Sequence, residues 1–121
     1  MSGSYRDLRA WQRSLNLVFE VYRSTQSFPK NEMYALTSQM RRAAISVSSN
    51  IAEGKGKSSD KEFILFLCHA RRSVLELETQ ALIAQKLGYL VKEDEGKIQW
   101  LTAEVGKLLN TLINSLNHAA A

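Results

Sequence analysis

Several features that mark whole classes of protein are scarce or missing in this sequence. Only one of its 121 residues is cysteine, Cys68, and only one is proline, Pro29. A single cysteine excludes an internal disulfide and is typical of proteins in a reducing compartment, so we expect a cytoplasmic location. No apolar run approaches the roughly 18 residues that cross a bilayer, and the first residues lack the basic start and apolar core of a secretion signal. We therefore expect neither a membrane span nor an exported protein.

The residues that are present have the balance of a folded domain. They are 45% hydrophobic and 23% charged, as in ordinary folded proteins and unlike disordered tails. We find no internal repeat, low-complexity segment or linker. A chain of this length is expected to form one domain, residues 1–121, around a modest core.

Positive charge is in excess, and it is unevenly placed. The formal net charge is +4 and the pI is about 9.4. Residues 1–61 hold ten Lys and Arg against five Asp and Glu, whereas residues 62–121 hold six against seven. The basic character therefore belongs to the first half and the middle of the chain, where it favours acidic partners.

Apolar residues recur at alternating steps of three and four, which is the pattern of helices packed along a seam. No segment shows sustained alternation with period two, so we expect no strands. The four predicted seams are Leu8, Trp11, Leu15, Val18 and Tyr22; Leu36, Met40, Ala43 and Val47; Phe63, Leu67, Ala70, Val74, Leu77, Ala81 and Ala84; and Ile98, Leu101, Val105, Leu108 and Leu112. Four helices with short connections predict an all-α fold, an antiparallel up-down-up-down four-helix bundle.

The residues between the seams agree with this division. Pro29 falls between the first two helices, where its missing N–H does least harm. Gly54 and Gly56 interrupt the apolar pattern after the second helix. Residues 59–62 (Ser-Asp-Lys-Glu) fit a capping box for the third helix, and Gly88 is placed to end that helix in a left-handed conformation.

The second helix carries unusually little side-chain bulk. Two explanations stay open: large residues of the same chain, such as Phe63, Phe66 and Leu67, fill the space beside it, or a helix of another subunit packs against it. Asn50 continues the seam, where a polar residue can set helix register at some cost in stability. The small residues are Ala43, Ala44, Ser46, Ser48, Ser49 and Ala52.

A second apolar stripe on the third helix predicts self-association. Cys68, Leu75 and Leu82 repeat every seven residues, roughly 100° around the helix from the main seam. A second apolar face left in water would be adhesive, so we expect these residues at an oligomer interface. Leu17 and Trp100 also fall off their seams. The alternative is a wide interior that covers all of these side chains.

No nucleotide, metal or catalytic site is expected. The loop at residues 54–59 (Gly-Lys-Gly-Lys-Ser-Ser) lacks the first glycine of a phosphate-binding loop, because position 51 is Ile51, and it follows a helix rather than a strand. Phe66 stands where a bundle di-iron motif, Glu-x-x-His, would need a glutamate before His69. Cys68 and His69 are adjacent on a helix, so their side chains diverge by about 100° and make a poor nucleophile–base pair. We predict a protein without cofactor, metal or enzymatic activity.

Basic residues are the strongest functional signal in the sequence. Arg41 and Arg42 precede the middle loop by about twelve residues, and Arg71 and Arg72 follow it by about twelve, so antiparallel helices should bring both pairs to the same height. The seams turn three of these arginines outward and leave Arg71 at the flank. Such a stripe could neutralise several phosphates of RNA or DNA, although basic residues on helices are also commonly just solvated. The candidate nucleic-acid contacts are Arg41, Arg42, Lys55, Lys57, Lys61, Arg71 and Arg72.

A set of short motifs resembles one known family. In chain order the segments are residues 7–12 (DLRAWQ), 28–30 (FPK), 34–44 (YALTSQMRRAA), 49–54 (SNIAEG), 61–63 (KEF), 76–80 (ELETQ) and 87–90 (LGYL). From about Tyr5 to Leu90 they resemble the bacterial four-helix bundle proteins encoded within intervening sequences of 23S ribosomal RNA genes. More distant relatives are the accessory variability determinants of diversity-generating retroelements.

This resemblance implies a four-helix bundle assembled as a ring-like homopentamer with a basic surface. The retroelement relatives bind nucleic acid and a reverse transcriptase, so the same partners are expectations here. Two positions depart from the family pattern. Ser48 stands where many members carry proline, so the second helix should run straighter, and Arg72 adds charge where a small residue is common.

Two hypotheses of function therefore stand side by side. The first is an oligomeric, non-catalytic accessory protein that binds RNA or DNA. The second is a protein-interaction scaffold whose positive charge attracts an acidic protein partner. Both use the same cations.

Overall fold

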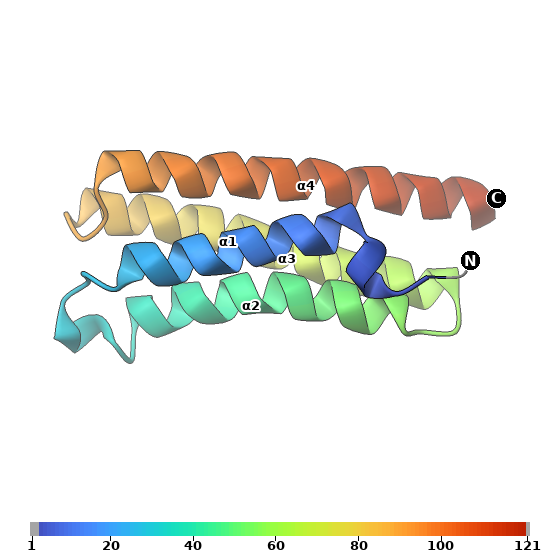
Figure 1. Ribbon diagram of the computed structural model, residues 1–121, viewed down its shortest axis with the longest axis horizontal. Helices are drawn as coiled ribbons and strands as arrows, with labels where there is room; N and C mark the ends of the chain where they lie inside the picture. Colours follow the sequence, from blue (N-terminus) through green and yellow to red (C-terminus); the bar gives the residue numbers. More distant parts are fainter. Residues whose placement is uncertain (1–2, 121) are drawn as a thin grey trace.

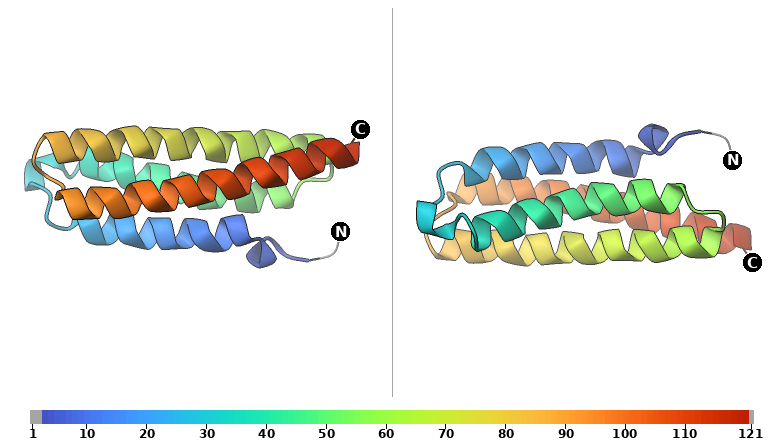
Figure 2. Two further views of the ribbon diagram at one scale, coloured as in Figure 1. Left: turned by 90° about the horizontal axis from the view of Figure 1, so that it is seen from above. Right: turned by 90° about the horizontal axis from the view of Figure 1, so that it is seen from below.

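Residues 3–120 are described by a computed structural model, and most of them lie in four long helices (Figure 1). Each helix runs antiparallel to the one before it, and α4 returns beside α1 (Figure 2). The start of η1, the end of α4 and the α2–α3 connection lie at one end of the bundle. The predicted all-α, up-down-up-down bundle is confirmed, with no strand among the described residues. The elements are η1 (Tyr5–Asp7), α1 (Arg9–Thr25), η2 (Lys30–Glu32), α2 (Leu36–Lys55), α3 (Asp60–Lys86) and α4 (Lys92–Ala120).

The core forms two clusters of buried side chains, one toward each end of the bundle. Leu17, Met40 and Leu77 belong to the cluster nearer the α1–α2 connection, and Ile51 and Leu67 to the cluster nearer the α2–α3 connection. All five side chains are fully buried. Burying one large apolar side chain stabilises a fold by about 1.5–3 kcal/mol, so this interior holds the helices together.

The seam predicted for α3 is confirmed, but the seam predicted for α1 is wrong. Every predicted position of α3 is buried, from Phe63 to Ala84. In α1 the buried stripe instead runs through Leu17 and Val21, and Tyr22 is exposed. The prediction missed this stripe because it contains serines, which interrupt the apolar pattern. A buried hydroxyl is tolerated there only when it is hydrogen-bonded. In the second half of α4 the buried positions are likewise shifted by one residue, to Leu109 and Ile113.

Two serine pairs connect neighbouring helices. The Ser14 hydroxyl donates to the Trp11 carbonyl at 2.6 Å and lies 2.7 Å from the Ser48 hydroxyl, which joins α1 to α2. The hydroxyls of Ser46 and Ser73 lie 2.9 Å apart and join α2 to α3. Asn50, expected to set register across the seam, instead donates to the carbonyl of Ser46 within its own helix at 2.8 Å. Register is therefore marked by the serines, and α2 continues through Ser48 without a break.

Gly54 lies inside α2 rather than in the loop after it, which corrects the predicted helix end. A Cβ at this position would lie 2.7 Å from Cβ of Phe66 and 2.9 Å from Cδ1 of Phe63. The missing side chain lets α2 and α3 approach closely. Ala43 and Ala44 are buried in the same bundle. Packing within the chain therefore accounts for the small buried residues of α2, including the glycine.

The predicted caps of α3 are confirmed in part at its start and fully at its end. The Ser59 hydroxyl accepts a hydrogen bond from the Glu62 N–H at 3.2 Å, but the Glu62 carboxylate accepts from serine hydroxyls rather than from the Ser59 N–H. Gly88 has φ +81°. Its N–H donates to the Gln85 carbonyl at 3.0 Å, and the next N–H donates to the Ala84 carbonyl at 3.0 Å, which closes the helix.

Candidate nucleic-acid interface

Cationic side chains without an ionic partner are concentrated in α2, α3 and the connection between them. Residues 36–72 contain seven Lys and Arg against three Asp and Glu, a surplus that equals the net charge of the whole chain, +4. Within residues 3–120, none of these seven takes part in an ion pair. The cations that do are Arg13, Arg23 and Lys97 of α1 and α4. The seven, called the α2–α3 cations below, are Arg41, Arg42, Lys55, Lys57, Lys61, Arg71 and Arg72.

Arg41 does not point outward, contrary to the prediction from the seams. Its Nε donates to the Thr25 hydroxyl at 2.9 Å, and its guanidinium carbon lies 4.5 Å from the centre of the Tyr22 ring. Because α1 is rotated relative to the predicted seam, these two side chains flank α2. Half-buried and stacked on a ring, Arg41 holds α1 to α2 and is less accessible than the other arginines of α2 and α3, which are exposed.

Arg42 and Arg72 are exposed, and both belong to the outer side of the α2–α3 pair. Arg42 lies across from Glu76 of α3, and Arg72 precedes Glu76 by one helical turn. The prediction that the arginine pairs share one height needs correction. The contact between Ser46 and Ser73 shows which residues of α2 and α3 lie at the same height. With a rise of 1.5 Å per residue in antiparallel helices, Arg42 and Arg72 are then about 7 Å apart along the bundle.

Arg71 turns toward α4. Its Nη1 donates to Oδ1 of Asn110 at 2.9 Å, and its Nη2 lies 3.7 Å from the sulfur of Cys68. The flanking position predicted for Arg71 is thus confirmed. The arginines of α2 and α3 therefore spread over three grooves of the bundle, and only Arg42 and Arg72 share the outer face.

The lysines of the α2–α3 connection form a cationic end to the bundle. The Lys57 ammonium lies 4.9 Å from the centre of the Phe66 ring, and the Lys55 ammonium lies 6.0 Å from that of Phe63. Both lysines also line a cavity of about 370 Å³ between this connection and the end of α4. Lys61 is exposed on the first turn of α3. The segment upstream of this connection is helix α2, as predicted, so the loop is not placed like a phosphate-binding loop.

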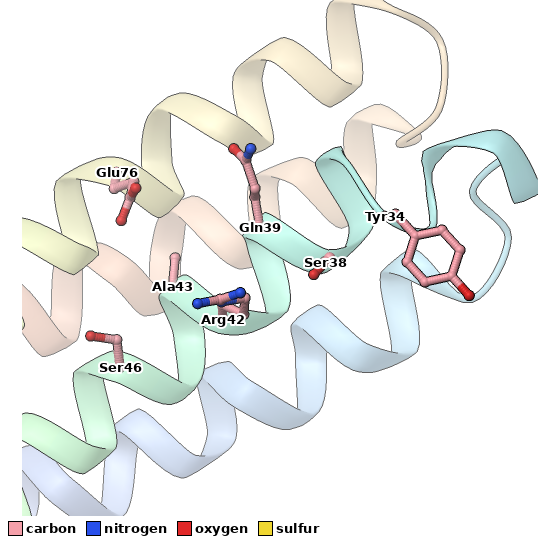
Figure 3. Close-up of a pocket in the computed structure, with 7 residues that line it drawn as sticks. All are labelled: Tyr34, Ser38, Gln39, Arg42, Ala43, Ser46 and Glu76. Carbon is pink, nitrogen blue, oxygen red and sulfur yellow. The ribbon is translucent and has the colours of Figure 1, made fainter.

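A polar groove of about 560 Å³ follows the side of α2 that faces α3 (Figure 3). Tyr34 stands at one end, in the turn before α2, and 97% of it is exposed. Sequence analysis had singled out only one of the lining residues as a binding residue. The repeat of Ser38, Arg42 and Ser46 at steps of four was a signal that could have identified this face. The polar lining consists of Tyr34, Ser38, Gln39, Arg42, Ser46 and Glu76.

Comparison with known proteins identifies the family. The model of the 23S rRNA-intervening sequence protein family matches residues 6–111. The chain belongs to this family. Its fold also matches a crystal structure from Bacteroides thetaiotaomicron, described as a protein of unknown function from the S23 ribosomal protein family. That match has a TM-score of 0.77 at 24% identity and covers 86% of this chain and 97% of the other, which supports the fold alone. No curated protein matches this chain.

The intervening-sequence family member exposes large apolar side chains on α3. Leu75 is 58% exposed and Leu82 48% exposed, so the second stripe does lie outside the core. Cys68 is half-buried and packs against the core cluster that contains Leu67. Leu65 and Ile83 are also exposed on this helix and were missed by the sequence analysis. Their separation of 18 residues, five full turns, places them on one face and was the available signal.

Two further observations concern metal binding and membranes. Among residues 3–120, no three or more His, Cys, Asp and Glu side chains come together as a metal site. None of the helices in the described part of the chain has the length and apolar character needed to cross a membrane.

Proposed function

We propose that this family member is a non-catalytic, homo-oligomeric protein that binds RNA or DNA through the α2–α3 cations. It would act in the cytoplasm as an accessory protein of a 23S rRNA intervening sequence or of a retroelement, where a reverse transcriptase is a further candidate partner. The observation that carries the proposal is the concentration of unpaired cations in residues 36–72. Cationic side chains that form no ion pair with a carboxylate are free to bind the phosphates of a nucleic acid.

The accessible cations differ in what they offer a phosphate. Arg42, Arg72, Lys57 and Lys61 are exposed and free of ionic partners within the described residues. Arg71 would first have to release Asn110, and Arg72 would have to release the His69 ring nitrogen, 2.6 Å from its Nη2. The other two, Lys55 and Arg41, are half-buried. Binding of this kind releases counterions from the nucleic acid, so it is salt-sensitive and largely independent of sequence.

Assembly into a ring, most simply the pentamer that the family resemblance implies, would place several copies of this weakly binding cationic surface on one particle. The exposed residues Leu75 and Leu82, with the neighbouring Cys68, support an oligomer interface on α3. Several copies of a patch on one particle act at a high effective concentration, which raises the affinity for a long nucleic acid without new contacts.

A salt titration of binding to a labelled RNA hairpin tests the proposal. Starting at roughly 50 mM salt, each phosphate contact should steepen the fall of log affinity with log salt by about 0.7 to 0.9. Replacing Arg42 and Arg72 by Gln should make the slope shallower. The control replaces two exposed lysines of α4, Lys92 and Lys107, by Gln, which removes the same charge outside the proposed surface.

An isotherm without binding at low salt, from a folded oligomer, contradicts the proposal. Binding to an acidic protein but to no nucleic acid would favour the scaffold function instead. Equal slopes for both double variants would show that net charge alone governs binding and that the α2–α3 surface is not the contact.

A further inference from the structure

The groove between Tyr34 and Ser46 contains polar side chains that have no hydrogen-bond partner within residues 3–120. Gln39 reaches from α2 toward α3, and Glu76 lies opposite on α3 (Figure 3). Neither these two side chains nor Arg42 makes a hydrogen bond or ion pair in the described part of the chain. An amide, a carboxylate and a guanidinium together present donors and acceptors to a ligand.

Tyr34 offers an open aromatic face at one end of this groove. The residue is 97% exposed, and its ring projects from the turn before α2 (Figure 3). Among the described residues no aromatic ring or cation packs on it. Exposed aromatic rings beside cationic grooves are the stacking platforms of proteins that bind single-stranded nucleic acid, because every base has a π-face.

Glu76 decides which part of a nucleic acid can lie in the groove. A carboxylate repels phosphates and accepts hydrogen bonds, so it disfavours the backbone there and favours a base edge that carries an amino group. Gln39 can both donate to and accept from such an edge. Base edges that carry an amino group belong to cytosine, adenine and guanine, and uracil lacks one.

The length of the groove suits a short single strand. From Leu36 to Ser46 the helix rises by about 15 Å. At about 3.4 Å per stacked nucleotide this spans roughly four nucleotides, the lower end of known single-strand site sizes. The groove volume of about 560 Å³ lies in the range typical of ligand sites.

We propose that this groove binds unpaired nucleotides, with one base stacked on Tyr34 and an amino-bearing base edge held by Glu76 and Gln39. Arg42, at the rim, would hold the phosphate that joins them. The inference rests on the proposed function and assigns it a second element, a base-binding site distinct from the backbone contacts of the other α2–α3 cations.

Binding of two labelled 12-nucleotide RNAs, rC12 and rU12, tests this inference beside a 12-base-pair RNA duplex. The intact protein should bind rC12 more tightly than rU12. Tyr34→Ala should weaken rC12 binding at least fivefold, whereas Tyr34→Phe should retain it because the ring can still stack. Duplex affinity should stay unchanged in both variants. The matched control is Phe19→Ala, which removes another exposed ring, on α1.

A second variant separates base recognition from charge. Glu76→Ala should bring the ratio of rC12 to rU12 affinity to about one, even if both affinities rise because repulsion is removed. Glu53→Ala removes an exposed carboxylate of α2 outside the groove and should leave the ratio unchanged.

The outcomes distinguish the two proposals. Duplex binding by the intact protein with unchanged rC12 affinity in Tyr34→Ala overturns the base-binding groove alone. Failure of the folded protein to bind any of the three RNAs overturns the proposed function and the groove together. A change of oligomer mass in Tyr34→Ala, measured by light scattering, would make Tyr34 a subunit contact and also overturn the groove.

Discussion

The helix pair α1–α4 and the helix pair α2–α3 use their charges in opposite ways. Between α1 and α4 the charges are paired: Arg23 donates to Asp94 at 2.8 Å, and Arg13 lies 3.7 Å from Glu104. Between α2 and α3 the contact is made by small residues instead, with Gly54 against Phe66. A helix pair held by close backbone approach does not need its cations for cohesion. Its exposed cations, such as Arg42 and Lys61, have no ionic partner within the described residues.

We expect the exposed leucines of α3, Leu75 and Leu82, to carry the contact between subunits. Leu75→Glu with Leu82→Glu should reduce the particle to species near the chain mass of 13.7 kDa, because each new charge opposes burial in the interface. Helix content by circular dichroism should be retained, since both side chains are outside the core.

Ser49→Glu adds charge to the exposed side of α2 and serves as the control for this double variant. Multi-angle light scattering measures all three proteins. A single-chain mass for the unmodified protein at micromolar concentration would contradict the interface, and loss of helicity in the double variant would place these leucines in the core.

Adding one methyl group at Gly54 should weaken the α2–α3 contact directly. We expect Gly54→Ala to lower the free energy of unfolding by about 1–3 kcal/mol, because the new Cβ would overlap the two phenylalanines. Gly106→Ala in α4 is the matched control: nothing lies within 4 Å of its Cβ, so it should stabilise by about 0.5–1 kcal/mol. Urea denaturation of both variants measures the difference. If both substitutions stabilised the protein, the helices around Gly54 would have to move apart at little cost, which would contradict the expectation.

The smallest expected effect belongs to the α1–α4 charges. Burial alone would raise the pKa of Glu20, but hydrogen bonds from Arg23 and Ser24 outweigh it and lower the pKa below its ordinary 4.5. The stabilisation is present above the unfolded value and is lost as the pH falls through the lower folded value. Arg23→Gln should therefore cost about 0.3–1 kcal/mol at pH 7 and less at pH 3 or in high salt.

Arg42→Gln provides the contrast, because this arginine has no ionic partner within residues 3–120. Thermal unfolding at pH 7 should show the Arg23 variant less stable than the Arg42 variant. Equal losses of stability in the two variants would contradict the contrast between the paired charges of α1–α4 and the unpaired cations of α2–α3.

Sequence patterns predicted the fold and much of its layout because the strongest seams contain only apolar residues. The α3 seam could be read directly, since each of its predicted positions, the first at Phe63 and the last at Ala84, is apolar and buried. The exposed leucines at 75 and 82 followed from the same period. Motifs such as residues 49–54 also indicated the family that the family model then matched.

The α1 stripe was misread because hydrogen-bonded serines stand in it. Ser14 is fully buried yet polar, and its hydrogen bonds to the Trp11 carbonyl and the Ser48 hydroxyl make that position acceptable in a core. No single-chain pattern reveals such a pairing, since the partner lies 34 residues away. The wrong seam for α1 also made the prediction for Arg41 wrong, because the direction of its side chain depends on which residues α1 turns toward α2.

The sequence by itself determined that four amphipathic helices would pack antiparallel, because apolar periodicity and short connections are properties of the chain. It also determined the excess of cations in residues 36–72. Only the tertiary structure decided where those cations point, since one residue of shift turns a side chain by about 100°. Packing turned Arg41 toward Tyr22 and Arg71 toward Asn110. The groove beside Tyr34 likewise depends on how α2 lies against α3, because residues of both helices line it and the contact between Ser46 and Ser73 joins them there.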